Sequence, residues 1–180
     1  MNETNIVAIV GSLRAGSVNR AVARAAIGGA PDGVNVELFD LAAIPLFNAD
    51  DEDAGIPSAV QALHDLVGAA DGLMIFSPEY NGSFPAVTKN AIDWLTRPPK
   101  AWENTAVSMV VTTPGPRGGE SFRSHFDKIM GYQPIRLHES LGIGDYGEKL
   151  GDDGEVNDPD TLTQLAAYVA TFAAFATSAE

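Results

Sequence analysis

The sequence predicts an α/β fold in which a parallel sheet of five strands is covered by helices on both faces. Short apolar runs alternate with helical patterns along the chain, and alternation at this spacing is typical of parallel sheets. The expected strands are almost continuously apolar, as strands buried on both faces are. The 180 residues contain no internal repeat and no linker, so we expect a single domain, residues 1–180.

The first part of the chain contains two expected strands around one helix. Residues 6–10 are an apolar run that ends at Gly11, which fits a strand buried on both faces. The alanine-rich segment 18–30 fits a helix, and the alternation of residues 34–39 indicates a second strand. Residues 41–56 are irregular and acidic, so we expect a surface excursion there.

The middle of the chain contains one expected strand between two helices. We expect a helix to begin at Ser58, where Gln61 would complete a capping box. Residues 72–76 indicate the third strand. Residues 85–95 predict a helix that ends before the proline-rich segment 97–99.

The last part of the chain supplies two more strands and two helices. Residues 105–111 and 134–137 indicate the fourth and fifth strands, on either side of a helix at 121–130. The polar, glycine-rich segment 142–160 predicts a solvated surface loop. A final helix is expected to begin after Asp158, with proline at its first position. Its expected buried stripe consists of Leu162, Leu165, Val169, Phe172 and Ala176.

Five parallel strands in a domain of this size suggest the strand order 2-1-3-4-5 with right-handed crossovers. In such a sheet, ligands bind beyond the carboxyl ends of the strands, near the switch between strands 1 and 3. We therefore expect the loops after strands 1, 3 and 4 to carry the function.

Composition excludes several classes of function. The chain has no cysteine, which excludes a disulfide, a thiolate metal site and a dithiol redox centre. Its formal net charge of −13 disfavours nucleic acid and anionic membranes as partners. The three histidines fall on separate elements, so we expect no metal site. No apolar run is long enough for a membrane span and no signal peptide pattern is present, so we expect a cytoplasmic protein.

The loop after the first strand, residues 11–20, has the composition of an anion site. It opens a helix, whose first amides and positive dipole end attract anions. Ser12, Ser17 and Asn19 add side-chain donors, and Arg14 adds a cation, so the loop suits a terminal phosphate. The alternative is that Ser17 only caps the helix and that Arg14 is solvated. The dinucleotide fingerprint and the Walker motif are both absent from this loop.

The loop after the third strand, residues 77–83, could face a flat heterocycle such as a flavin. Pro78 stiffens the strand exit, and Asn81-Gly82 permits positive φ. The loop could therefore present backbone donors and acceptors to a flavin edge, with Tyr80 packed near the ring. The alternatives are that Tyr80 is a half-buried loop aromatic and that Glu79 is a solvated charge.

The loop after the fourth strand, residues 112–119, is rich in glycine and proline. Glycine lets a flat ring approach the main chain, and Thr112 or Thr113 could donate to it. Arg117 could attract the phosphate of a nicotinamide nucleotide or could be a plain surface charge.

Two motifs together resemble the NADPH-dependent FMN reductase family, which includes bacterial quinone, chromate and azo reductases. They are Gly-Ser-Leu-Arg-x-Gly-Ser-x-Asn, from Gly11, and Ser-Pro-Glu-Tyr-Asn-Gly-Ser-x-Pro, from Ser77, with Lys-Asn-Ala-Ile-Asp-Trp-Leu at 89–95. The resemblance extends over about residues 5–119. Thr88 stands where leucine is usual in the family, and Ala86 where glycine is usual.

The resemblance implies a flavodoxin-like fold, bound FMN, NADPH or NADH as the electron donor, and a homodimer or homotetramer. It implies that the first loop holds the phosphate and that the second and third loops line the isoalloxazine ring. Flavin carries the chemistry in such enzymes, so we expect no catalytic side chain. The full set of expected cofactor-binding residues is Ser12, Leu13, Arg14, Ser17, Val18, Asn19, Pro78, Glu79, Tyr80, Asn81, Gly82, Thr112, Thr113 and Gly115.

The function we expect is that of an FMN-dependent NAD(P)H oxidoreductase. Hydride would pass through flavin N5 to quinones or similar small acceptors. The main alternative is a flavodoxin-type electron carrier without NAD(P)H turnover of its own. A flavin-free scaffold on the same fold and a reductase that releases its FMN are further alternatives.

Overall fold

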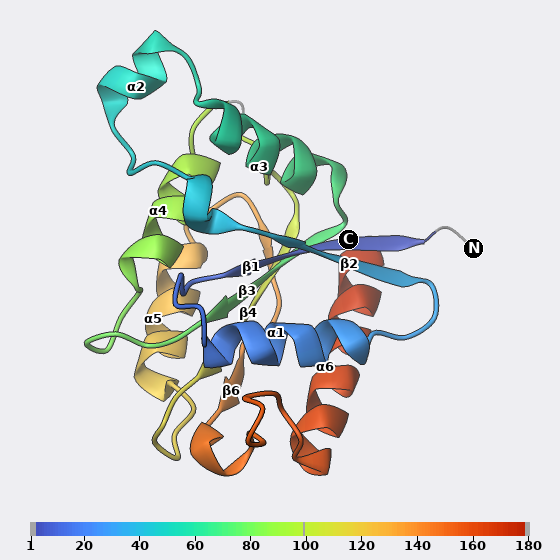
Figure 1. The fold of residues 1–180 in the computed structure, drawn as a ribbon. Coiled ribbons are helices and arrows are strands. Elements are labelled where there is room, and N and C mark those ends of the chain that lie inside the picture. The colour runs from blue at the N-terminus through green and yellow to red at the C-terminus, as the bar shows by residue number, and fades with distance from the viewer. Residues whose placement is uncertain (1–2, 99, 179–180) are drawn as a thin grey trace.

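The computed structural model describes residues 3–98 and 100–178 and shows one parallel sheet with helices on both faces (Figure 1). The strands are β1 (Thr4–Val10), β2 (Val34–Phe39), β3 (Gly72–Ser77), β4 (Ala106–Thr112), β5 (Arg136–Leu137) and β6 (Leu141–Ile143). The α-helices are α1 (Val18–Gly28), α2 (Ala49–Ala54), α3 (Ser58–Ala69), α4 (Ala86–Leu95), α5 (Glu120–Met130) and α6 (Pro159–Thr177). Two short 3₁₀ helices, η1 and η2, span Leu41–Ala43 and Tyr146–Glu148.

The strand order is β2-β1-β3-β4-β5, as the sequence predicts, and every pairing is parallel. The fifth strand is shorter than expected, with only Arg136 and Leu137 paired to β4. A sixth strand that the sequence did not predict, β6, pairs with the carboxyl end of β4. The outer position of the sheet is therefore shared by two short strands, and β6 directs the chain toward the carboxyl edge.

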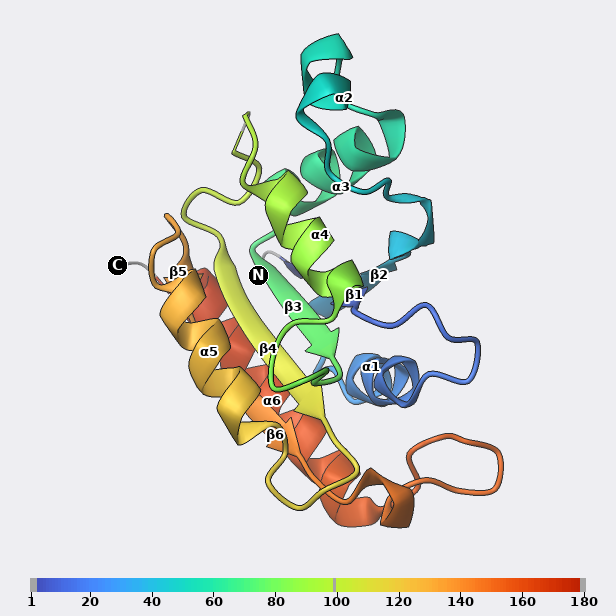
Figure 2. The ribbon, with the colours of Figure 1, turned by 90° about the vertical axis from the view of Figure 1, so that its left-hand side faces the viewer.

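The two faces of the sheet pack against different helices (Figure 2). Ile6, Ala8 and Val10 of β1 belong to the core with α1 and α6. Val7 and Ile9 belong to the core with α3, α4 and α5. Successive side chains of a strand point to opposite faces, so a continuously apolar strand supplies both cores. Burying each large apolar side chain stabilises the fold by about 1.5–3 kcal/mol.

Three local expectations are wrong. A helix, α2, lies inside the segment expected to be irregular, capped by the Asn48 side chain. The acidic side chains in its first turn are stabilised by the positive end of the helix dipole. The helix itself has no apolar stripe. The capping box at the start of α3 is absent, because Pro57 is the N-cap and Gln61 Nε2 donates instead to Asp65 Oδ1 at 2.7 Å.

The third error concerns α6. Asp158 caps this helix and Pro159 is its first residue, as expected. Leu162, however, is exposed, whereas the rest of the expected stripe is buried. Thr161 takes the buried place in the first turn, because its amide and hydroxyl both donate to Asp158 Oδ2, at 2.9 and 2.6 Å.

No helix among the described residues has both the length and the apolar character to span a membrane.

Candidate functional site

Two adjacent cavities lie at the carboxyl ends of the strands. The first, of about 260 Å³, adjoins the start of α1, and we call it the α1 cavity. The second, of about 340 Å³, adjoins the start of α5, and we call it the α5 cavity. Glu79 and Pro114 line both cavities. The residues that line the α1 cavity are Ser12, Arg14, Ser17, Val18, Asn19, Pro78, Glu79, Tyr80, Thr112, Pro114 and Tyr146.

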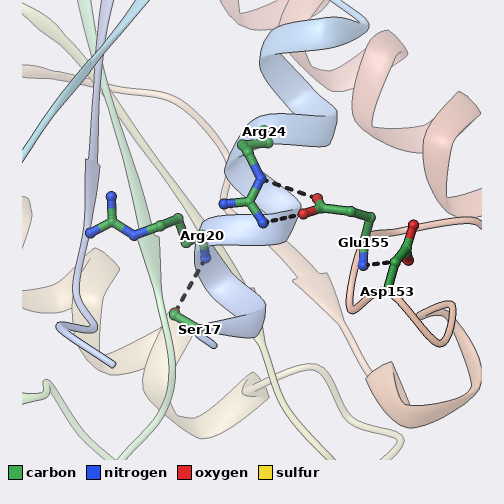
Figure 3. Close-up of polar contacts among 5 residues, drawn as sticks. All are labelled: Ser17, Arg20, Arg24, Asp153 and Glu155. Atoms are coloured by element: carbon green, nitrogen blue, oxygen red, sulfur yellow. Dashed lines mark hydrogen bonds and ion pairs between the residues drawn. The ribbon is translucent and has the colours of Figure 1, made fainter. Parts of the chain in front are cut away.

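The loop after β1 brings the first turn of α1 to the α1 cavity. Ser17 is the N-cap, and its hydroxyl accepts from the Arg20 amide at 3.3 Å (Figure 3). Val18 and Asn19 occupy the first turn, where amides have no acceptor within the helix. Arg14 is an exposed cation at the same cavity. The loop thus collects amides, a dipole end and one positive charge, which is the chemistry of a phosphate site.

Gly11 begins this loop at a point with no room for a side chain. A Cβ atom at Gly11 would lie 1.9 Å from Thr88 Oγ1 and 2.9 Å from Ser77 Oγ. The two hydroxyl oxygens are themselves 2.9 Å apart and share a hydrogen bond. The glycine therefore lets β1, β3 and α4 meet closely where the two functional loops begin. Thr88, which stands where leucine is usual in the family that the sequence resembles, lies at this junction.

The loop after β3 is a tight turn that crosses the edge of both cavities. The amides and carbonyls of Tyr80 and Ser83 exchange hydrogen bonds of 3.1 and 3.0 Å. Asn81 and Gly82 adopt φ values of 53° and 73°, as the central residues of a type I′ turn do. Ser83 Oγ also shares a 3.1 Å hydrogen bond with His125 Nδ1 of α5. The positive φ predicted from the Asn-Gly pair is confirmed.

The loop after β4 supplies the wall between the cavities. Thr112 ends β4 and is only 2% exposed. Thr113 Oγ1 donates to the carbonyl of Gly115 at 3.0 Å, which folds the loop back on itself. Gly118 and Gly119 have positive φ and lead into α5. Thr113, Gly115 and Arg117 line the α5 cavity.

Two buried polar atoms at the α1 cavity are without a partner among the described residues. Among the described residues, neither Asn19 Oδ1 nor Thr112 Oγ1 has a hydrogen-bond partner. Asn19 is 5% exposed and Thr112 is 2% exposed, and leaving such a group unpaired costs about 1–3 kcal/mol. One atom follows β1 and the other ends β4, so a single molecule in the cavity could pair with both. The donor set and these unpaired atoms fit a planar ligand that carries a phosphate.

The structure brings most of the expected site residues together. Those that line the α1 cavity are Ser12, Arg14, Ser17, Val18, Asn19, Pro78, Glu79, Tyr80 and Thr112. Gly82, Thr113 and Gly115 line the α5 cavity with Glu79. Within the described chain, Leu13 and Asn81 line neither cavity. The exposed Leu13 instead lines an apolar groove with Leu41, Ile44 and Leu46, and Asn81 is exposed at the tip of its turn.

Two residues of the α1 cavity were not expected from the sequence. Pro114 belongs to the loop after β4, and only its neighbours were singled out. Tyr146 lies in η2, within the segment that we expected to be a solvated loop. The only signal for Tyr146 is an aromatic residue in a glycine-rich segment, which alone indicates no site.

Comparisons with known proteins found a matching family model and several related chains. The model of the NADPH-dependent FMN reductase family matches residues 4–140. A quinone reductase of Escherichia coli is 35% identical over 176 residues, covering 94% of each chain. An NAD(P)H-dependent FMN reductase of Pseudomonas aeruginosa is 46% identical over 99 residues, about half of each chain. The solved structure of FerB, a flavoenzyme NAD(P)H:(acceptor) oxidoreductase from Paracoccus denitrificans, has a TM-score of 0.85 and 27% identity, with 96% and 97% of the two chains covered.

Proposed function

Because this chain belongs to the NADPH-dependent FMN reductase family, it is an FMN-dependent NAD(P)H oxidoreductase, and we propose that it reduces quinones or similar small acceptors with FMN held in the α1 cavity. The observation that supports this location for FMN is that three strand-end loops meet around two buried polar atoms that are unpaired among the described residues. FMN held there would supply the redox chemistry, which is hydride transfer with NAD(P)H at N5 and electron transfer to the acceptor.

The first turn of α1 holds the phosphate in this proposal. The net charge of −13 repels an anionic cofactor, so binding depends on local donors. The amides of Val18 and Asn19 and the side chains of Ser12 and Ser17 provide neutral donors at the cavity. Arg14 adds the cation that offsets the overall field.

The loops after β3 and β4 orient the ring. The turn at Tyr80–Ser83 presents backbone groups in a fixed conformation, because its positive φ values are locked by two hydrogen bonds. Thr112 Oγ1 is buried and free to pair with the ring edge, as far as the described residues show. Glu79 and Tyr80 border the ring at the mouth of the cavity. These residues bind and orient, and none is asked to transfer a proton.

The α5 cavity is the place that we propose for the second reactant. It shares a wall with the α1 cavity, so a nicotinamide or an acceptor bound there would adjoin the flavin. Arg117 lines it and could attract a nucleotide phosphate. Burial of the reactants between these loops would exclude water and strengthen the electrostatic interactions of the site.

We also propose a homodimer or homotetramer, located in the cytoplasm, in which residues 1–180 form one domain. The support for self-association is an apolar groove lined by Leu13, Leu41, Ile44 and Leu46, in which Leu13 and Leu46 are exposed and Leu41 is buried. Light scattering coupled to gel filtration measures the mass directly, and a monomer at all concentrations would contradict this part of the proposal.

The experiment that tests the function is an absorption spectrum followed by anaerobic titration. The purified protein, supplied with FMN, is expected to show a flavin spectrum that NADPH or NADH bleaches without air and that a quinone restores. A spectrum that neither nucleotide bleaches would indicate an electron carrier. A protein that does not bind added FMN would indicate a flavin-free scaffold. Gel filtration of the yellow protein then separates retained from released FMN.

A further inference from the structure

Tyr146 lines the α1 cavity from a segment that lies beyond the residues matched by the family model, 4–140. We propose that residues 144–158, which we call the strap, form an additional wall of the FMN site, with Tyr146 as a contact residue for FMN. We further propose that the ion pair between Arg24 and Glu155 positions the strap. The inference rests on the proposed location of FMN and goes beyond the motifs that define the family.

The near end of the strap is fixed to the loop after β4 by backbone contacts. The amide of Thr113 donates to the carbonyl of Ile143 at 2.9 Å, and the amide of Asp145 donates to the carbonyl of Gly115 at 3.2 Å. A Cβ atom at Gly144 would lie 2.5 Å from the carbonyl oxygen of Pro116, so the two main chains touch. This close contact places η2 beside the cavity wall.

Asp145, directly before Tyr146, has a left-handed backbone. Its φ of 51° lies in the left-handed region, which costs a residue other than glycine free energy and persists only where its surroundings require it. Asn81, on the opposite loop, has the same kind of conformation. The two tyrosines that line the cavity, Tyr80 and Tyr146, therefore each adjoin a residue with a left-handed backbone.

The far end of the strap is tied to α1 (Figure 3). Arg24 Nη2 and Nε donate to Glu155 Oε1 and Oε2 at 2.5 and 3.1 Å. Asp153 Oδ1 accepts from the amide of Glu155 at 3.0 Å and so orients this residue. Val156, bridged to Leu150, is buried against the core that contains α1. In Figure 3, Arg24 points from α1 toward the strap, whereas Arg20 points away from it.

The ion pair links two walls of the same cavity. The first turn of α1 forms the phosphate side, and Arg24 lies about two turns further along this helix. The geometry is that of a bidentate arginine–carboxylate pair, which is the stronger and more directional kind. Its side chains are 47% and 46% exposed, so solvent screening keeps the effect moderate. We expect the pair to set how long FMN stays bound.

The test measures FMN binding and release rather than turnover. FMN is titrated into FMN-free protein by flavin fluorescence, and its release from the loaded protein is followed after dilution. Tyr146→Ala is expected to weaken binding about tenfold, as loss of an aromatic contact with a ring does. Tyr146→Phe should retain most of the affinity. Arg24→Gln and Glu155→Gln should each speed FMN release about two- to fivefold.

Matched variants separate this effect from general damage. Asp40→Asn removes the other ion pair of α1, Arg20–Asp40 at 3.6 Å, and should leave FMN release unchanged. Tyr132→Ala removes an exposed tyrosine beyond the far end of α5 and should leave affinity unchanged. The double reversal Arg24→Glu with Glu155→Arg should restore slow release. Circular dichroism of each variant confirms that the fold is intact.

The outcomes are distinguishable from failure of the proposed function. If the unaltered protein binds no FMN, the proposed cofactor location is wrong and the strap proposal is wrong as well. If the unaltered protein binds FMN and Tyr146→Ala binds it equally well, the strap proposal alone is overturned. If Arg24→Gln and Glu155→Gln release FMN no faster than Asp40→Asn does, the ion pair has no positioning role.

Discussion

The hydroxyl oxygens of Ser77 and Thr88 lie 2.9 Å apart beside Gly11, where β1 ends and the loop to α1 begins. This contact joins the last residue of β3 to the first turn of α4. It also fills the space that any side chain at position 11 would need. The starts of the loops after β1 and β3 are therefore held at one junction.

Replacing Gly11 with alanine is expected to destabilise the protein by about 1–3 kcal/mol, as overpacking of a filled core does. The added methyl group would overlap Thr88 Oγ1. Thermal unfolding measures the effect. Gly28→Ala is the control, because a Cβ atom there meets nothing within 4 Å among the described residues and its melting temperature should be unchanged or higher. Equal melting temperatures for the two variants would contradict the crowding at Gly11.

Thr112→Val is expected to change stability and FMN binding in opposite directions. Removing an unpaired buried hydroxyl should leave the free energy of unfolding of the FMN-free protein unchanged or raise it. FMN affinity should fall about three- to tenfold, the effect of one lost hydrogen bond. Thr161→Val should instead lower the free energy of unfolding and leave FMN affinity unchanged, because its hydroxyl donates to Asp158 at 2.6 Å in the cap of α6. A Thr112→Val variant with unaltered FMN affinity would remove this residue from the site.

Arg14→Gln tests the phosphate end of the site. Loss of the only cation lining the α1 cavity, as the described residues define it, should weaken FMN binding about tenfold, the range of a charge-assisted contact. Riboflavin, which has the same ring but lacks the phosphate, should bind equally to both proteins. Added salt should weaken FMN binding to the unaltered protein more than to the variant. An equal loss for riboflavin would place Arg14 at the ring instead.

The alkaline limit of stability should depend on Tyr168. Burial raises the pKa of Tyr168 from 10.0 to about 12, and its hydrogen bond with Ser108 only partly opposes this. The folded protein thus prefers the neutral phenol. The stability that this preference contributes is fully present below pH 10 and is lost as the pH rises toward about 12.

Urea unfolding across this alkaline range measures the loss. Tyr168→Phe should remove the part of the decline due to this residue, whereas Tyr132→Phe, at an exposed tyrosine, should keep it. A decline of the same size in Tyr168→Phe would assign the alkaline limit to other groups.

The fold could be predicted where the sequence pattern is local and strong. β1, β3 and β4 are long apolar runs buried on both faces, and their order followed from the alternation with helices. β5 was predicted at 134–137 but has only two paired residues, and β6, which was not predicted, has three, too few for a periodic signal. α2 lacks an apolar stripe and depends on the Asn48 cap and its acidic first turn. Such local effects are smaller than those of a buried face.

The site could be predicted wherever a loop directly follows a strand. The motifs after β1 and β3 and the loop after β4 do so, and the structure gathers them at two neighbouring cavities. Tyr146 could not be found this way. Its place depends on the pairing of Ile143 with Thr112, a non-local contact through a strand that the sequence does not reveal. A polar, acidic segment was therefore interpreted as plain surface.

β5 and β6 pair with β4 separately, so the chain between them can change in length without moving β5. Arg136 of β5 donates to the carbonyls of Phe175 and Ala176 in α6, at 3.0 and 2.7 Å, so the amino half of the sheet edge is secured independently of β6. Insertions or deletions after Ser140 can then reshape one side of the pocket without shifting the register of the upstream strands.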